Sequence, residues 1–506
     1  MNGSILPLLV FSPLAGILLL LFVKGQQEKV IKVIGILATL PALLFSLYLF
    51  FQFRAGEKLS QYSLKLEWFR FGNFKEFDPN LYAVRFELGV DGFSLVMLVL
   101  TSVLCTLAAI ASMHIKKGWK GYFLLFFTLQ IGMLGVFTAE NLILFFLFFE
   151  VTLIPMFFLI GKWGFEKREQ AAYSFLIYNG LGSAILLIVI MILFAKTGTS
   201  NIAVLQQIIP SGGVTLISNV SPELKYGLLI ALIIAFGVKL PIFPLHTWML
   251  RVHVQAPPSI VMLHAGVLLK IGAFGLIRFG MGIFPEQFSN ISIFIIVLGL
   301  INLLYGAFLA LIQKDFKMVL AYSSISHMGI VLIGLGAMNE AGIQGAIFQV
   351  VSHGLIAALL FFLVGVMYER TKTTELAELS GLAKSMPIFS GFLLAGGMAS
   401  LGLPGMSGFV SEFMAFLGVF EQYPVLGGLG AVGLILTAVY VLRAVLAITF
   451  GEIGKASLNA LADVKGMEWA PLLVLMGLIV LVGVYPTILA DPLTDTMKTI
   501  LLGLGG

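Results

Sequence analysis

Charged side chains are scarce in this chain. They make up 11% of its 506 residues, whereas soluble globular domains carry roughly 25%. Apolar residues account for 59%, and the mean hydropathy is +1.05. Apolar runs recur along the whole chain, each close to the ~20 residues that a helix needs to cross the hydrocarbon core of a bilayer. This composition excludes a soluble globular protein and predicts a polytopic helical membrane protein.

Cysteine is nearly absent too. The single cysteine, Cys105, lies in an apolar run, so the chain can form no internal disulfide and no iron–sulfur cluster ligated by its own cysteines. The opening Met-Asn-Gly-Ser-Ile-Leu-Pro lacks a basic n-region, and we therefore expect no cleaved signal peptide. The net charge of +5 is interpreted as a sign of membrane topology, and we expect no nucleic-acid partner.

Motifs of redox or hydrolytic chemistry are missing as well. The stretch Gly428-Leu-Gly430-Ala-Val-Gly433 fits the dinucleotide fingerprint, but it lies in an apolar span with no preceding strand. We interpret it as a site of helix packing. The sequence contains no Walker motif, metal-ligand cluster, haem-attachment motif or catalytic triad signature. The energy for any work is therefore expected to come from partners or from an ion gradient.

Fourteen hydrophobic spans can be drawn along the chain, which predicts an all-α fold forming a single membrane domain over residues 1–506. The spans are 4–23, 30–53, 88–113, 121–139, 141–161, 171–195, 226–249, 257–280, 288–312, 317–338, 342–368, 386–420, 424–450 and 470–490. Lysine and arginine are more frequent in loops on the side that holds the 24–32 loop. The positive-inside rule makes that side cytoplasmic. Because the number of spans is even, both termini are expected on the outer side.

Four lysine and glutamate residues lie deep inside these spans, away from the span ends. The most informative is Lys239, in the run Ala-Phe-Gly-Val-Lys-Leu-Pro-Ile-Phe-Pro-Leu-His (235–246); the others are Glu150, Lys270 and Glu412. Each such residue costs about 2.5–3.5 kcal/mol at membrane depth, so the four cost roughly 10–14 kcal/mol together. That sum is comparable with the stability of a whole domain, about 5–15 kcal/mol. A chain that carries them is expected to move charge.

A Leu-Pro pair recurs beside the buried charges. Leu240-Pro241 follows Lys239, and Leu403-Pro404 precedes Glu412. The two pairs lie in spans seven and twelve. An offset of five spans reverses the direction across the membrane, so repeated units would be inverted. Interrupted spans at matching places in two halves are typical of a transporter's ion site. The alternative is a pair of unrelated proline kinks.

Five stretches of the chain resemble the antiporter-like subunits of respiratory complex I. They are Glu140-Asn-Leu-Ile-Leu-Phe-Phe-Leu-Phe-Phe-Glu-Val-Thr-Leu-Ile-Pro155, Gly237-Val-Lys-Leu-Pro-Ile-Phe-Pro-Leu-His246, Ala265-Gly-Val-Leu-Leu-Lys-Ile-Gly272, Tyr322-Ser-Ser-Ile-Ser-His-Met-Gly329 and Leu403-Pro-Gly-Met-Ser-Gly-Phe-Val-Ser-Glu-Phe413. The resemblance covers essentially the whole chain. That family is related to subunits of Mrp-type sodium/proton antiporters and membrane-bound hydrogenases. The M type of NADH-quinone oxidoreductase, the counterpart of mitochondrial subunit 4, is most similar. It has an acid at the position of Glu412, where L- and N-type relatives usually carry lysine.

The resemblance implies a chain of proton-exchanging side chains through the middle of the membrane. An acid of span five pairs with the lysine of broken span seven, and a lysine of span eight connects the two halves. Histidines of spans ten and eleven continue the hydrated axis, and a residue of span twelve hands the proton to the outer side. The matching residues are, in that order, Glu150, Lys239, Lys270, His327, His353 and Glu412.

The resemblance also implies an architecture and a set of partners. Three N-terminal helices (4–113) precede two inverted five-helix repeats (121–280 and 288–450), and one helix (470–490) follows, with helices 7 and 12 discontinuous. The expected partners are the lipid bilayer, L- and N-type antiporter-like subunits and small membrane subunits. No cofactor is expected in this chain: NADH, FMN, iron–sulfur clusters and quinone belong to partner subunits. The membrane would be a bacterial or archaeal plasma membrane, or an organellar inner membrane.

Three readings of the function stay open. The chain is a proton-translocating subunit of a complex I-type oxidoreductase, a subunit of an Mrp-type antiporter or membrane-bound hydrogenase, or a membrane spacer whose polar axis is inactive. Glu150 and Lys239 could form only a structural ion pair, and His327 and His353 could be structural histidines.

Two departures from the family pattern add further alternatives. His264 occupies a place where M-type members usually have no histidine, so it either adds a relay position or only fills polar space. Arg251 stands where the family usually has an acid, and would reverse the charge at the cytoplasmic mouth. For His246 and His253, the latter expected in a short loop, we expect structural or surface roles. Such changes would suit a second copy of the subunit or a paralogue in another complex.

Overall fold

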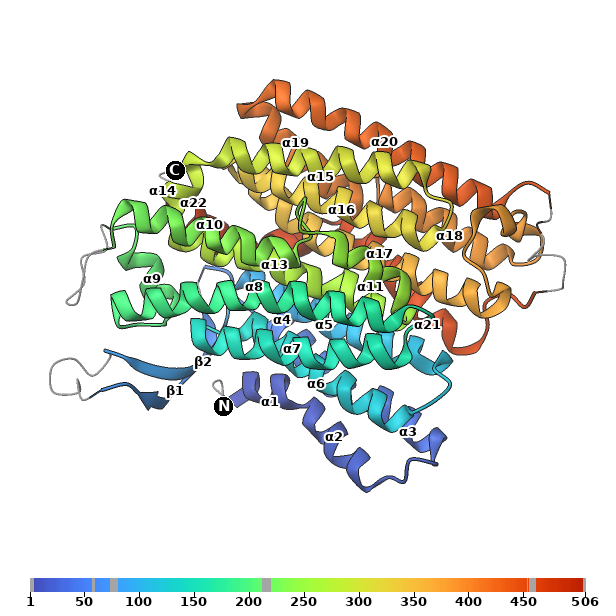
Figure 1. Ribbon diagram of the computed structural model, residues 1–506, viewed down its shortest axis with the longest axis horizontal. Helices are drawn as coiled ribbons and strands as arrows, with labels where there is room; N and C mark the ends of the chain where they lie inside the picture. The colour runs from blue at the N-terminus through green and yellow to red at the C-terminus, as the bar shows by residue number, and fades with distance from the viewer. Residues whose placement is uncertain are drawn as a thin grey trace.

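The computed structural model describes residues 4–56, 60–72, 81–211, 220–452, 454 and 461–503. Its long helices run side by side in one bundle, with α1–α3 on one flank and α19 and α20 on the opposite flank (Figure 1). The described α-helices are α1 (Ile5–Phe11), α2 (Pro13–Phe22), α3 (Glu28–Leu37), α4 (Leu40–Gln52), α5 (Gly92–Ala111), α6 (Trp119–Thr138), α7 (Leu142–Trp163), α8 (Arg168–Thr197), α9 (Ile202–Ile208), α10 (Pro222–Lys239), α11 (Thr247–Gln255), α12 (Pro258–Leu263), α13 (Leu269–Gly275), α14 (Pro285–Asn290), α15 (Ser292–Ile312), α16 (Phe316–Gly336), α17 (Glu340–Thr371), α18 (Pro387–Ser400), α19 (Ser407–Gln422), α20 (Pro424–Thr449), α21 (Trp469–Val484) and α22 (Thr487–Gly503).

A two-stranded antiparallel sheet corrects the prediction of an all-α fold. Strands β1 (Gln61–Arg70) and β2 (Ala83–Val90) pair along most of their length at one end of the bundle (Figure 1). The segment Leu-Lys-Leu-Glu within β1 alternates apolar and polar residues, which favours a strand. A search for long apolar runs overlooks that pattern. The third predicted span, 88–113, consequently starts too early, because residues 88–90 belong to β2 and α5 begins at Gly92.

Eleven helices of the described chain are long and apolar enough to cross a membrane. The count rises to twelve if α1 and α2, which meet at a bend of 43°, form one span. The predicted spans 226–249 and 386–420 each consist of two shorter helices, α10 with α11 and α18 with α19. The last predicted span, 470–490, has a wrong boundary: α21 ends at Val484, and α22 continues from Thr487 to Gly503.

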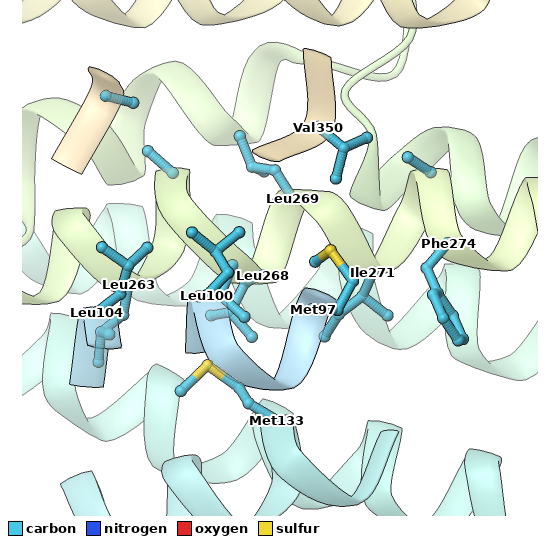
Figure 2. Close-up of a cluster of buried hydrophobic side chains, with 14 of the residues drawn as sticks. Met97, Leu100, Leu104, Met133, Leu263, Leu268, Leu269, Ile271, Phe274 and Val350 are labelled. Atoms are coloured by element: carbon cyan, nitrogen blue, oxygen red, sulfur yellow. The ribbon is translucent and has the colours of Figure 1, made fainter. Parts of the chain in front are cut away.

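The segment 258–281 is the best-buried candidate span, with every residue of its most hydrophobic stretch inside the protein. It comprises α12, the π-helix η3 (His264–Leu268), α13 and the π-helix η4 (Leu276–Met281). Its Leu263, Leu268 and Ile271 share one apolar cluster with Met97 and Leu100 of α5 (Figure 2). Lys270 lies on this segment, and the surrounding packing keeps it away from lipid.

The glycine motif at 428–433 lies inside α20, where the sequence predicts helix packing. A Cβ atom on Gly430 would come within 2.4 Å of the Phe416 ring, and one on Gly433 within 2.5 Å of Leu303. The missing side chains let α20 approach α19 and α15 closely. The interpretation as helix packing is confirmed.

Candidate functional site: a buried polar axis

Lys239 is the last residue of α10, and its side chain is only 2% exposed. The helix stops there because Pro241 has no N–H to continue the ladder. The side chain of Asn302 on α15 bonds to the backbone groups that the break leaves unpaired. It accepts a hydrogen bond from the Phe243 N–H at 2.8 Å and donates one to the Pro241 carbonyl at 3.1 Å. Helix breaks at membrane depth are tolerated when protein groups satisfy them in this way.

The Lys239 ammonium group lies over aromatic rings. Its Nζ is 4.7 Å from the centre of the Phe149 ring and 5.7 Å from that of Phe175. Cation–π contacts of this kind compensate part of the cost of a buried positive charge. In the described part of the chain, no ion pair within 4 Å joins Lys239 to a carboxylate, although Glu150 is close enough to interact with it electrostatically.

Glu150 lies in the middle of α7, beside Phe149. The residue is partly exposed at the surface of the bundle, while its Oε1 atom is buried and has no hydrogen-bond partner in the protein. The resemblance predicts that Glu150 and Lys239 act as a pair. The geometry brings them near one another without direct contact, so a change in their separation would change their interaction energy.

Lys270 makes a direct contact with a histidine of another helix. Its side chain is 0% exposed, and its Nζ lies 2.6 Å from Nδ1 of His353 on α17. The sulfur of Met328 on α16 is 3.7 Å from the same Nζ. No carboxylate of the described residues comes within ion-pair distance of Lys270. This lysine therefore has an imidazole as its polar partner.

The two predicted histidines continue from there toward Glu412. The rings of His353 and His327 have their centres 5.3 Å apart. Nδ1 of His327 lies 3.4 Å from Oε1 of Glu412, within ion-pair distance but outside hydrogen-bond geometry. All three residues are at most 5% exposed. The structure thus joins Lys270, His353, His327 and Glu412 in one buried row that crosses four helices.

Neighbouring polar groups hold this row in place, and no pattern in the sequence indicated them. Gln349 donates to Nδ1 of His327 at 3.2 Å and accepts from Ser411. Nε2 of His327 lies 3.3 Å from the hydroxyl of Ser400, the last residue of α18. Glutamine and serine are common in membrane helices, so only their three-dimensional position marks them as part of the site.

Glu412 lies in the second turn of α19, close to the break between α18 and α19. The chain turns through Gly402 and Gly405, which both have positive φ values, +76° and +90°. A Cβ atom on Gly402 would lie 2.6 Å from Oε2 of Glu412. The glycine therefore leaves room for the carboxylate against the broken helix end.

The structure corrects one expectation about the histidines near the first helix break. His253 does not lie in a loop or at the surface, because it is in α11 and 0% exposed. His246, 1% exposed, contacts the Tyr305 hydroxyl with Nε2 at 3.2 Å. His253 and His264 contact one another directly, which the spacing of eleven residues across a helix break did not indicate.

A cavity of ≈ 450 Å³ lies at one end of the bundle. Its lining includes many of the cations that the sequence assigned to the cytoplasmic side: Lys116, Lys117, Lys162, Arg168 and Lys372. Trp163 and Phe165 also line it. The β-hairpin and the start of α1 lie toward the other end (Figure 1). Many of the lysines and arginines that the sequence assigns to the cytoplasmic side thus lie together at one end of the bundle.

Comparison with known proteins identifies the family and the fold of this chain. Residues 139–437 match the family described as NADH:quinone oxidoreductase/Mrp antiporter, TM. The chain is 35% identical over 495 residues to NADH-quinone oxidoreductase subunit M of Rhodobacter capsulatus, covering 96% of this chain and 94% of the relative. It is 34% identical over 491 residues to NADH-ubiquinone oxidoreductase chain 4 of Arabidopsis thaliana, with 96% and 94% covered. A chain of respiratory complex I from Thermus thermophilus has a TM-score of 0.85 at 28% identity, covering 99% of this chain and 100% of that one.

The fold and the buried axis define a polytopic membrane protein of the antiporter-like class. The chain belongs to the NADH:quinone oxidoreductase/Mrp antiporter family, and over nearly its full length it is similar to subunits named M or chain 4. The resemblance drawn from the five motifs is confirmed. A chain of the Mrp complex from Dietzia shares the fold, with a TM-score of 0.83 at 20% identity, covering 100% of this chain and 99% of that one.

Proposed function

We propose that this chain is a proton-translocating membrane subunit of a complex I-type NADH-quinone oxidoreductase. The observation that carries the proposal is the continuous buried row Lys270–His353–His327–Glu412. A lysine, two histidines and a carboxylate can each take up and release a proton. Ionisable residues inside membrane helices usually mark an ion pathway.

Transfer along the row needs only small movements. A proton on the Lys270 amine can pass to the free electron pair of His353 Nδ1, because the two nitrogens are already at hydrogen-bond distance. Nδ1 of His327 lies 3.4 Å from the Glu412 carboxylate, and a proton bound to that nitrogen, in place of the hydrogen bond that Gln349 donates, faces the carboxylate. Gln349 and Ser400 hold the His327 ring between these two steps. Glu412 is the terminal residue, from which the proton leaves toward the outer side.

The partly exposed Glu150 and the buried Lys239 form the coupling end of the axis. Two unit charges ~8 Å apart interact by about 2 kcal/mol at an effective dielectric of ~20. Moving one proton against ~150–200 mV needs roughly 3.5–4.6 kcal/mol. One pair is therefore insufficient, whereas two or three coupled sites in series supply the required energy.

We further propose fourteen membrane crossings. The eleven candidate spans (one of which joins α3 and α4), the bent pair α1–α2 and the interrupted pairs α10–α11 and α18–α19 add up to that number. Helices α10 and α11 both pack against α8, which supports a single broken crossing. Residues 121–280 and 288–450 form the two inverted repeats, between helices 4–113 and 470–490. The basic cavity is cytoplasmic, and both termini face outward.

The redox reaction takes place in partner subunits. NADH, FMN, iron–sulfur clusters and quinone bind there, while this chain contributes the membrane pathway. L- and N-type antiporter-like subunits and small membrane subunits flank it in the membrane arm. Glu150, partly exposed on α7, suits a charge that responds to a neighbouring subunit.

A second function is favoured by one observation, the family description that joins oxidoreductase and Mrp antiporter subunits. In that case the same axis would exchange a cation for protons in an Mrp-type antiporter, or would serve a membrane-bound hydrogenase. Co-purification distinguishes these functions: a complex I subunit purifies with NADH-oxidising subunits, and a hydrogenase subunit with hydrogen-oxidising ones.

The proposed function is tested with the purified complex in sealed vesicles. Electron transfer and proton uptake are recorded together for the wild type, Lys239→Ala and Lys225→Ala. Lys225 is the matched control, because it is a buried lysine of the same helix whose Nζ donates to the Ile209 carbonyl at 2.7 Å. We expect Lys239→Ala to assemble and to lose coupled turnover or pump fewer protons per electron. Lys225→Ala should keep the wild-type ratio.

Unchanged proton stoichiometry in an assembled Lys239→Ala complex would refute the proton-path function. The chain would then be a membrane spacer, and its buried charges would have a structural role. Equal losses in both lysine variants would show a general effect of removing a buried lysine rather than a path through Lys239.

A further inference from the structure

The basic cavity at one end of the bundle combines a cationic rim with an apolar interior. Its cations come from the ends of three helices and from one connection between helices: Lys116, Lys117, Lys162, Arg168 and Lys372. These five side chains belong to exposed residues. Met262 and Phe362, at most 3% exposed, line the interior. The volume of ≈ 450 Å³ is in the range of small-molecule sites, about 300–1,000 Å³.

Most of the positive charge around the cavity has no negative partner. The one carboxylate in the lining, Glu369, lies 3.4 Å from the Nζ atom of Lys372. Among the described residues, no ion pair within 4 Å joins the other four cations to a carboxylate. Like charges around one concave surface repel each other and attract anions to the space between them. An anion in the cavity would relieve that repulsion.

A sixth cation lies behind the cavity wall. Lys317 is 5% exposed, and its Nζ is 3.6 Å from the centre of the Phe165 ring and 4.8 Å from that of Tyr368. Both rings line the cavity. No carboxylate of the described residues lies within 4 Å of this Nζ, and its one hydrogen bond there is to the Val254 carbonyl at 3.5 Å. The charge of Lys317 therefore adds to the positive potential of the cavity.

The backbone that carries the cations is held by specific contacts. Trp163 donates from Nε1 to the Lys117 carbonyl at 2.7 Å, which fixes the connection before α6 against the end of α7. Gln255 accepts from the Phe165 N–H at 2.7 Å with its carbonyl and from the Lys167 N–H at 2.9 Å with its side chain. The turn that leads to Arg168 is therefore fixed too. Cations on such a backbone are positioned before a ligand arrives, which lowers the cost of binding.

The positive-inside rule alone explains only part of this arrangement. It accounts for lysine and arginine on one side of the membrane. It does not account for cations from four separate segments around one cavity, or for an unpaired lysine behind the wall. Lys314 and Lys384, assigned to the same side by the sequence, lie outside the cavity lining.

We propose that the basic cavity binds a phosphate-bearing anion. Lysine and arginine form strong charge-assisted hydrogen bonds with phosphate oxygens, and the apolar interior suits the carbon part of a phosphate ester. Two sources share this chemistry, a free phosphate ester and the head group of an anionic phospholipid. Basic pockets between membrane helices on the cytoplasmic side bind such head groups in other proteins. The inference goes beyond the proposed function, because binding here requires no proton path.

The experiment uses the intact complex purified in a neutral detergent, at constant ionic strength. Radiolabelled glycerol 3-phosphate is titrated by equilibrium dialysis, and bound phosphatidylglycerol is counted by native mass spectrometry. One double variant carries Lys162→Gln with Arg168→Gln, and a second carries Lys116→Gln with Lys117→Gln from another part of the rim. The control carries Lys314→Gln with Lys384→Gln. It removes the same charge from two exposed residues of the same side, outside the cavity lining.

We expect the wild type and the control to bind one equivalent of at least one probe that both cavity variants bind at least about tenfold more weakly, as for loss of hydrogen bonds to a charged group. If glycerol 3-phosphate alone shows this difference, the ligand is a free phosphate ester. If phosphatidylglycerol shows it and glycerol 3-phosphate displaces the lipid only in large excess, the ligand is a lipid head group.

Two results would overturn the proposal. In the first, neither probe distinguishes the wild type from the cavity variants. In the second, the control loses as much binding as the cavity variants, which would show a diffuse attraction to the basic side of the protein. Both cavity variants change exposed residues, so assembly of either one is sufficient for the comparison.

Discussion

The ammonium nitrogen of Lys270 and Nδ1 of His353 lie 2.6 Å apart, although the two residues are 83 positions apart in the sequence. Both residues are at most 5% exposed, and the 2.6 Å separation leaves no room for a water molecule between the two nitrogens. At this distance only one of the two facing atoms can carry the shared hydrogen as donor, while the other must accept it. The shared proton can therefore reside on either of the two nitrogens.

Replacing Lys270 tests this contact. We expect Lys270→Met, which retains the volume of the side chain, to leave the complex assembled and to reduce coupled turnover at least about tenfold, a barrier increase of about 1.4 kcal/mol. The apolar replacement also removes a costly buried charge, so the thermal stability should be equal or higher. Turnover in vesicles and thermal unfolding of the purified complex measure the two effects. A Lys270→Met complex with normal pumping would contradict the role of Lys270.

Gly402 offers a test that changes no titratable group. In Gly402→Ala the new Cβ would lie 2.6 Å from Oε2 of Glu412, so the carboxylate must move. Gly405→Ala is the control, because Gly405 also has positive φ but nothing lies within 4 Å of its Cβ position. Both variants should lose about 1–2 kcal/mol of stability from the left-handed backbone. Only Gly402→Ala should lower the number of protons pumped per electron.

One outcome would contradict the prediction for Gly402→Ala. If both alanine variants pump alike while Gly402→Ala retains the fold, displacing the Glu412 carboxylate has no effect on transport. Glu412 would then not be the terminal residue of the path.

The ion pair of Arg278 with Asp91 is expected to stabilise the fold strongly. The Asp91 carboxylate is 1% exposed, contacts Arg278, and accepts from the Ser94 N–H at the start of α5. Arg278→Met leaves this carboxylate buried without its partner, which costs about 3–5 kcal/mol. Lys372→Met, which breaks an exposed pair with Glu369, should cost about 0–1 kcal/mol.

Thermal unfolding of the purified protein measures these differences. Adding Asp91→Asn to Arg278→Met should recover part of the lost stability. The unpaired negative charge of Asp91 is then removed, and asparagine still caps the start of α5. A stability of the Arg278→Met variant equal to that of Lys372→Met would contradict the structural importance of the pair.

Glu140, in the short connection between α6 and α7, gives a prediction about pH. Burial raises the pKa of this carboxyl above its usual 4.5, and the hydrogen bond from Ser60 and the charge of Arg278 compensate only in part. The folded protein thus binds the Glu140 proton more tightly than the unfolded chain. The stability contributed by this proton is present below pH 4.5 and is lost as the pH rises through the folded-state pKa.

Glutamine at position 140 imitates the protonated carboxyl and does not titrate. The melting temperature of Glu140→Gln relative to the wild type should therefore increase from about pH 5 to about pH 8. Glu67→Gln is a suitable control, because Glu67 lies half-exposed on β1 and pairs with Arg70. A difference for Glu140→Gln that stays constant or decreases with pH would show that the carboxyl is not held in its protonated form.

Much of the site could be predicted from single residues in the sequence, because a charge in an apolar span is conspicuous. Lys239, Lys270 and Glu412 were chosen for that reason, and all three are buried. Glu150 is only partly buried, which the composition of its span does not reveal. The hydrogen-bonding groups around His327, such as Gln349 and Ser400, could not be predicted, because such residues are unremarkable in a membrane helix.

The sequence by itself determined the class of protein, the approximate positions of most spans and the residues able to carry protons. Those properties depend on local hydrophobicity and on the cost of individual charges, which are additive along the chain. Only the tertiary structure decided which of these residues touch. The contacts Lys270–His353, His327–Glu412 and His253–His264 join residues of different helical segments. Helices that are apolar on all sides carry no periodic pattern to reveal their facing sides, so those contacts depend on side-chain packing across the whole bundle.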